Sequence, residues 1–236
     1  MMPVNELALK VGNFFLNTPY VSSTLDVTVA ENLVINLRQM DCFTFLENVI
    51  VLTKLIREKR TNFEIFAATL QKVRYRDGKL QGYSSRLHYF CDWYYDNQLK
   101  GFIFDITRDL GGVSCKKNIN FMTKHPDLYP ALKKSAPFNE MLSVEKDLSS
   151  RSLYRLRKAN INQCTDKIKD GDIIAVTTNK TGLDVLHAGF AIYLQSELHL
   201  LHASKTQGKV IVSKQTLFDY LEEKKERTGI LVGRIL

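Results

Sequence analysis

The chain has 236 residues, is 44% hydrophobic and carries a formal net charge of +8. With only 12 Gly and 5 Pro, the composition excludes a disordered chain and allows one large domain or two small ones. The positive charge favours polyanionic partners such as nucleic acid, an anionic lipid surface or an acidic cell-wall polymer. Alternatively, the charged residues serve only to solvate the surface. No basic stretch interleaves with aromatic residues as in nucleic-acid-binding modules, so we expect no nucleic-acid partner.

No apolar run approaches the roughly 18 to 20 residues of a membrane-spanning helix, so no membrane span is expected. Residues 1–6 lack the basic and then apolar order of a signal peptide. We expect a periplasmic or secreted protein if a signal peptide was removed or omitted, and a cytoplasmic one otherwise. The cysteines are not at metal-ligand spacing, so no metal site is predicted at Cys42, Cys91, Cys115 or Cys164.

The N-terminal part of the chain predicts helices. Apolar side chains recur at helical spacing over residues 3–17, and a turn-rich stretch follows over residues 17–26. A wide apolar stripe over residues 42–57 predicts a second helix with a core-facing side. Asp41 directly precedes this stripe and is a candidate helix cap, so Cys42 is expected in the first helical turn.

The middle of the chain is less regular. Residues 61–70 predict a short helix, residues 86–99 an aromatic-rich helix, and residues 101–109 alternate in places as a strand does. Residues 130–165 are charged and are expected to form an irregular insertion or a connector between lobes of a single catalytic domain spanning residues 1–236.

The last third predicts mostly strands. We expect strands over residues 172–178, 187–194, 198–203, 210–212 and 230–236. Between the last two, Ser213 is expected to cap a helix over residues 213–223. Helices followed by a run of antiparallel strands indicate the α+β class, because alternating α/β folds would intersperse them.

Cys42 is the candidate nucleophile. A thiol reacts as the thiolate, and a helix N-terminus, a nearby imidazolium and partial exposure all favour that form. Free N–H groups at the helix start would also hold an oxyanion during acyl transfer. On a helix, however, a lone cysteine is more often a small buried hydrophobe.

His187 is the candidate general base. It opens an alternating segment in which Gly189 and Ala191 share its face, and these small residues leave room for a substrate and for a sulfur partner. A catalytic imidazole also needs a partner that orients its second nitrogen. The next strand offers His202 and, as a fallback, His199; three residues apart, they face opposite sides of a regular strand.

These segments resemble the NlpC-type cell-wall cysteine peptidases, which have a papain-like fold. The resemblance lies in Asp41-Cys42-Phe43-Thr44-Phe45, Gly171-Asp172-Ile173-Ile174, His187-Ala188-Gly189-Phe190-Ala191-Ile192-Tyr193 and Leu201-His202-Ala203-Ser204. It implies that Cys42 is the nucleophile, His187 the base and His202 the orienting residue. Phe43-Thr44 replaces the usual Ser-Gly after the cysteine, and the two histidines lie three residues further apart than is common.

Further motifs are similar to the N-acetylmuramoyl-L-alanine amidase-like branch: Glu47-Asn48-Val49, Ser85-Arg86-Leu87-His88-Tyr89-Phe90, Phe121-Met122 and Thr181-Gly182-Leu183-Asp184-Val185. The branch implies hydrolysis of the muramoyl–L-alanine amide in peptidoglycan fragments, including anhydro-muropeptides, without a metal or other cofactor. Arg86 would pair with a peptide carboxylate. The other candidate substrate contacts, each of which also admits a structural role, are Asp41, His88, Tyr89, Asp184 and Ser204.

Three alternatives remain at the level of the sequence. The same nucleophile would serve a peptidoglycan stem-peptide endopeptidase, or a papain-like thiol acyltransferase. A non-enzymatic wall-binding module is the third, although three triad-type residues in order argue against it. The oligomeric state is not predicted.

Overall fold

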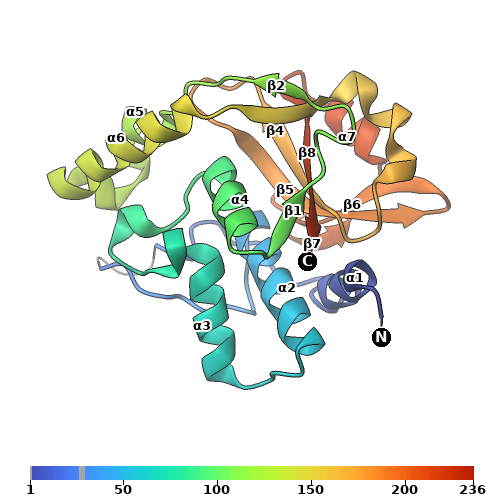
Figure 1. The fold of residues 1–236 in the computed structure, drawn as a ribbon, viewed down its shortest axis with the longest axis horizontal. Helices are drawn as coiled ribbons and strands as arrows, with labels where there is room; N and C mark the ends of the chain where they lie inside the picture. Colours follow the sequence, from blue (N-terminus) through green and yellow to red (C-terminus); the bar gives the residue numbers. More distant parts are fainter. Residues whose placement is uncertain (1, 27–29) are drawn as a thin grey trace.

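The computed structural model describes residues 2–26 and 30–236, with most helices on one side of a large sheet (Figure 1). The N-terminal helices pack together below the sheet, and a smaller helical group formed by α5 and α6 extends from one end. The helices are α1 (Val4–Phe14), α2 (Cys42–Arg57), α3 (Phe63–Arg74), α4 (Phe90–Leu99), α5 (Phe121–Lys124), α6 (Ser135–Ser150) and α7 (Leu217–Glu222). Within the described residues, no helix is long and apolar enough to cross a bilayer.

The sheet has eight strands in the order β2-β3-β8-β4-β5-β6-β7, with β1 pairing separately to β8, and all its pairings are antiparallel. The strands are β1 (Ile103–Asp105), β2 (Val113–Cys115), β3 (Leu153–Arg157), β4 (Ile173–Thr178), β5 (Val185–Leu194), β6 (Glu197–Ser204), β7 (Lys209–Val212) and β8 (Arg227–Ile235). The arrangement is α+β with an antiparallel sheet, to which the middle of the chain also contributes β1, β2 and β3.

The central strands are buried on both faces, which explains their near-continuous apolar sequences. Phe190 and Leu201 point to the face covered by α1 and α2, in the larger core cluster. Leu200 and Ala191 point to the opposite face, where they pack with Leu217 of α7. Alternation along β5 and β6 places His187 and His202 on this second face.

Residues 130–165 differ from the irregular structure expected for them. They contain the 16-residue helix α6 and the strand β3, which joins the main sheet beside β8. Only Met141, Glu145 and Leu148 are buried in α6, so its core-facing stripe is narrow and its sequence looks charged throughout.

The helix expected from Ser213 begins later. Thr216 is the N-cap of α7, and its side chain accepts a hydrogen bond from the backbone N–H of Asp219. The Ser213 hydroxyl instead accepts from the N–H of Leu200 and donates to the carbonyl of Gln215, so it ties the turn to β6.

Candidate active site

Cys42 is the first residue of α2, and Asp41 caps this helix as predicted. The Asp41 carboxylate accepts from the backbone N–H groups of Phe43, at 3.0 Å, and Thr44, at 2.8 Å. The Thr44 hydroxyl accepts in return from the Asp41 N–H at 3.0 Å, which completes a capping box. Thr44, one of the two residues that depart from the usual Ser-Gly, therefore helps to fix the first turn around Cys42.

The Cys42 sulfur is half-buried between α2 and β5. The backbone N–H groups of Ala188, the residue that follows His187, and of Cys42 and Phe43 lie near the sulfur and favour its thiolate form. Burial, with a smaller contribution from Asp41, nevertheless raises the pKa of the thiol to about 12. In the free protein Cys42 is therefore a neutral thiol.

His187 and His202 form a direct pair. Nε2 of His187 lies 2.6 Å from Nδ1 of His202, and the two ring planes stand at 82° to one another. His199, the alternative, points away and places its Nδ1 3.0 Å from the Ser213 carbonyl oxygen. Because Nε2 of His187 faces His202, Nδ1 is the ring nitrogen that would exchange a proton with any other group.

The pair lies where the paired register of β5 with β6 ends. The paired register of β5 with β6 covers Phe190 to Leu194, so the His187 end of β5 lies beyond it, next to a bulge against β4. A Cβ added to Gly189 would come within 2.8 Å of the His202 Cβ and 2.6 Å of the Leu201 carbonyl oxygen. Gly189 therefore lets His202 approach β5 closely.

Both imidazoles are held in their neutral form. Burial, then His202 and Arg227, lowers the pKa of His187 well below its ordinary value. Burial, then Arg227, lowers the pKa of His202 to about 4. The site at neutral pH is therefore a neutral thiol beside two neutral imidazoles.

Two tyrosines that the sequence did not single out complete the cluster. Burial, followed by negative charge on Cys42 and Asp41, raises the pKa of Tyr20 to about 12, so this phenol is protonated and close to the sulfur. The Tyr220 ring centroid lies 6.1 Å from that of His187 and 5.8 Å from that of His202. Tyr20 lies in a turn-rich stretch and Tyr220 on a short helix, and neither position carries a local motif.

Three of the predicted substrate contacts already have protein partners. Arg86 is buried and forms ion pairs with Asp26 and, at 3.2 Å, with Glu31. Nε2 of His88 lies 2.8 Å from the Tyr83 carbonyl oxygen. Asp41 holds the helix cap described above, so the structural role that the sequence also allowed is present for all three.

The remaining predicted contacts are also engaged within the chain. The Tyr89 hydroxyl donates to Glu145 at 2.6 Å, and the Asp184 carboxylate accepts from the Cys91 N–H at 2.6 Å. Ser204 accepts from the Gln207 N–H at 3.2 Å. Substrate binding by these residues stays a prediction.

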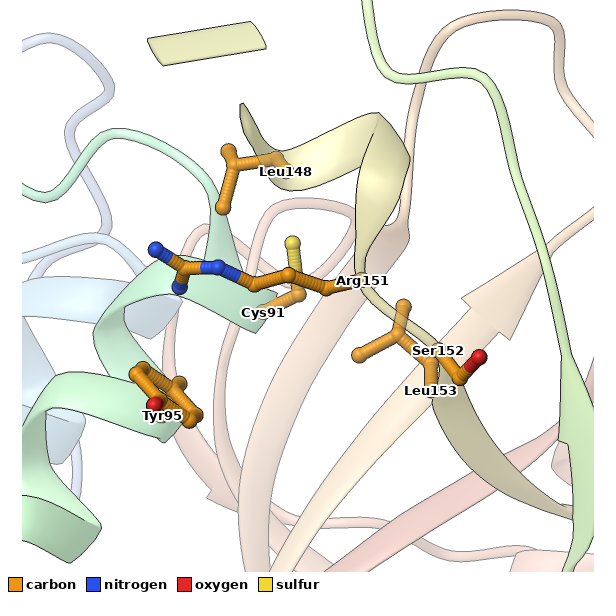
Figure 2. Close-up of a pocket in the computed structure, with 6 residues that line it drawn as sticks. All are labelled: Cys91, Tyr95, Leu148, Arg151, Ser152 and Leu153. Carbon is orange, nitrogen blue, oxygen red and sulfur yellow. The ribbon is translucent and has the colours of Figure 1, made fainter. Parts of the chain in front are cut away.

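A cavity of about 160 Å³ lies between α4 and the junction of α6 with β3, and Figure 2 shows the side chains that line it. The Arg151 guanidinium lies 4.5 Å from the centroid of the Tyr95 ring and pairs with Asp92 and Asp147. Cys91 lines this cavity, but Cys42, His187 and His202 do not. The cavity is therefore separate from the cysteine–histidine cluster, and its arginine already serves to join α6 to α4.

Nothing in the described parts of the chain gathers three or more Cys, His, Asp or Glu side chains in a way that could hold a metal ion. The chemistry that the cluster could support is nucleophilic, because it holds a thiol at a helix start and a nearby imidazole that is paired with a second imidazole.

One family model matches most of the chain. The model of the AmiA-like family, described as N-acetylmuramoyl-L-alanine amidase-like, matches residues 10–230. Among curated proteins, none matches this chain.

Several solved structures are similar over nearly the full length. An N-acetylmuramoyl-L-alanine amidase from Bacteroides uniformis is 40% identical, with 99% of each chain covered and a TM-score of 0.93. A candidate xylanase from Bacteroides fragilis is 41% identical, with 96% of this chain and 100% of that chain covered and a TM-score of 0.91. A Legionella pneumophila protein shares the fold at 20% identity, with 100% of this chain and 90% of that chain covered and a TM-score of 0.76. The chain belongs to the N-acetylmuramoyl-L-alanine amidase-like family.

Proposed function

We propose that this protein is a cysteine amidase that hydrolyses the bond between the muramic acid lactyl group and L-alanine in peptidoglycan fragments. The observation that carries the proposal is the cluster itself: the Cys42 sulfur lies near the backbone N–H of Ala188, the residue next to His187, and His187 is paired with His202 at 2.6 Å. Membership of the amidase-like family and the name of the Bacteroides uniformis relative support the substrate and the bond.

The proposed reaction begins with neutral groups. His187, donating from Nε2 to His202, takes the thiol proton at Nδ1 while the Cys42 sulfur attacks the lactyl carbonyl. The thiol with its pKa of about 12 does not need to ionise beforehand, because the proton moves as the sulfur–carbon bond forms. His202 accepts from the imidazolium that results and stabilises it without taking its proton.

The carbonyl oxygen becomes an oxyanion at the start of α2. The N–H groups of Phe43 and Thr44 already donate to Asp41, which leaves the Cys42 N–H as the backbone donor. The Tyr20 phenol, kept protonated beside the sulfur, supplies a second donor. His187 then protonates the leaving L-alanine amine, and water, activated by the same imidazole, hydrolyses the thioester.

We further propose that the architecture is papain-like and NlpC-type. Its support is the chain order of a cysteine at a helix start, a histidine on one strand and a second histidine on the next strand of an antiparallel sheet. The resting site would hold a neutral thiol and a neutral imidazole instead of a preformed thiolate–imidazolium pair. Burial of Cys42 and His187 and the nearby positive charge of Arg227 account for this difference.

The name of the Bacteroides fragilis relative raises glycoside hydrolysis as a second activity. That chemistry typically needs two carboxyl groups roughly 5 to 9.5 Å apart on either side of the sugar bond. The carboxylate at this cluster, Asp41, is held in the helix cap by two backbone N–H groups. We therefore favour the amidase over a glycosidase.

Mass spectrometry of purified muropeptides after incubation tests the proposal. The expected products are a peptide with a free L-alanine amine and the intact sugar with a free lactyl carboxylate. Cleavage within the stem peptide would indicate an endopeptidase, transfer of the acyl group to an added amine would indicate an acyltransferase, and xylan cleavage would indicate the glycosidase. The Cys42→Ala variant should bind muropeptide but release no peptide, whereas a wall-binding module would show no turnover in either protein.

A further inference from the structure

Arg227 is a buried cation behind the histidine pair. It is the first residue of β8 and is 7% exposed. Its guanidinium carbon lies 3.7 Å from the centroid of the Tyr220 ring, and its Nη1 donates to the Tyr220 carbonyl oxygen. A planar cation at this distance stacks on an aromatic ring and holds it in place.

The Tyr220 ring in turn packs against both imidazoles. It stands at 74° to the His202 ring and at 42° to the His187 ring, with centroids about 6 Å away. Since α7 is only six residues long, its own backbone bonds hold Tyr220 less firmly than a longer helix would. Arg227 at the start of β8 therefore holds the Tyr220 ring, against which His187 and His202 pack.

The positive charge of Arg227 opposes the imidazolium that the proposed mechanism forms on His187. A buried positive charge disfavours a second positive charge nearby, and it acts on His187 and His202 alike. Glu223 accepts from Arg227 at 3.0 Å, but its side chain is 54% exposed, so water screens its negative charge. The other titratable groups around the pair are Cys42 and Asp41 at the start of α2, Tyr20 from the N-terminal segment and Tyr220 from α7.

We infer, on the basis of the catalytic role proposed above for His187, that Arg227 is a positioning residue: it holds Tyr220 against the histidine pair and places a buried positive charge behind that ring. Neither Arg227 nor Tyr220 is among the residues that the sequence motifs carry. The arrangement keeps His187 available as a proton acceptor at acidic pH, where an unperturbed histidine would already be protonated.

Histidine titration by NMR tests this directly, in the intact chain and without reference to activity. In Arg227→Met the His202 pKa, about 4 in the parent, should rise by about one unit because a nearby cation is lost. Arg227→Lys keeps the charge and should leave the pKa nearly unchanged. The matched control is Arg155→Met: Arg155 lies on the adjacent strand β3 and donates to the Thr228 hydroxyl, so its loss should not move either histidine.

Activity adds a second readout. In Arg227→Met the acidic limb of the kcat/KM profile should move to higher pH, because His187 protonates earlier and can no longer accept the thiol proton. In Arg227→Lys the acidic limb of the profile should stay at the same pH as in the parent, but kcat should fall. The reason is that an ammonium group does not stack on the Tyr220 ring as a planar guanidinium does. Tyr220→Leu should lower kcat more than it raises KM, and Tyr220→Phe, which keeps the ring, should restore most of it.

The outcomes separate this inference from the proposed function. Unchanged histidine pKa values in a folded Arg227→Met variant, or an equal shift in Arg155→Met, would overturn the role of Arg227 whatever the enzyme cleaves. If Arg227→Met does not fold, Arg227→Gln retains a donor for the Tyr220 carbonyl and removes the charge, so the same pKa shift is expected there. A histidine shift in a protein that cleaves no muropeptide would support the Arg227 assignment and contradict the amidase proposal.

Discussion

Cys42 and Cys91 both lie in the first turn of a helix, yet their surroundings differ. Cys42 is half-buried, and its sulfur lies near the backbone N–H of Ala188, the residue that follows His187 of the histidine pair. Cys91, in the first turn of α4, is 5% exposed and faces the Asp184 carboxylate, which, after burial, raises the pKa of its thiol further. A helix N-terminus alone therefore does not distinguish the two cysteines; in the proposed mechanism, the nearby histidine pair makes Cys42 the one that reacts.

The largest expected effect separates the two cysteines. Cys42→Ala should reduce kcat by about 10³-fold or more, because it removes the group that forms the covalent intermediate. Cys91→Ala should leave kcat within about threefold of the parent, since Cys91 touches neither histidine. Muropeptide turnover measured for both purified variants, each checked for folding by circular dichroism, provides the comparison. Equal losses in the two variants would contradict the assignment.

The next effect separates the two histidines of β6. His202→Ala should lower kcat by about 10²- to 10³-fold, because the His187 ring loses the partner of its Nε2. His199→Ala removes only a contact to the Ser213 carbonyl and should cost stability more than activity. Turnover and urea unfolding, measured side by side, distinguish the two. A greater loss of activity in His199→Ala would make His199 the orienting residue.

Gly189 connects the histidine pair to the sheet. Gly189→Ala should displace His202, since the added Cβ would lie 2.8 Å from the His202 Cβ, and should cost about 1–3 kcal/mol of stability as a small-to-large change in a packed site. We expect an activity loss that is smaller than in His202→Ala. Gly208→Ala is a control for substitution of glycine alone, because a Cβ added there would meet no atom within 4 Å, although its positive φ adds a local strain. Parent-like turnover in Gly189→Ala would show that the close approach is not required.

The smallest effect concerns the resting thiol. With its pKa raised to about 12, Cys42 should react with iodoacetamide at a rate that keeps increasing with pH up to at least about 9. Cys91, whose thiol is more deeply buried, should react more slowly at every pH. Peptide mapping after timed alkylation measures both sites in one sample. A Cys42 rate that is already at its plateau near about pH 5 would indicate a preformed thiolate and contradict the neutral resting pair.

Local sequence patterns were sufficient for the parts of the site that depend on a single element. Asp41 before an apolar helical stripe places Cys42 correctly, and alternation along residues 187–194 places His187 on a strand. The choice between His202 and His199 depends on the register of β6 against β5, which no single strand encodes. The tertiary fold alone brings distant residues to the site, as it does for Tyr20, Tyr220 and Arg227. The helix α6 was not predicted because its buried stripe is narrow and most of its other residues are polar or charged.

The most direct test of the central claim is to run the muropeptide reaction in hydroxylamine, a small nucleophile that intercepts thioesters. Attack by Cys42 predicts that part of the released muramoyl product becomes the lactyl hydroxamate, in a fraction that increases with hydroxylamine concentration, and that Cys42→Ala forms none. If the parent enzyme releases only the free carboxylate at every hydroxylamine concentration while turnover continues, water attacks the amide directly and Cys42 is not the nucleophile.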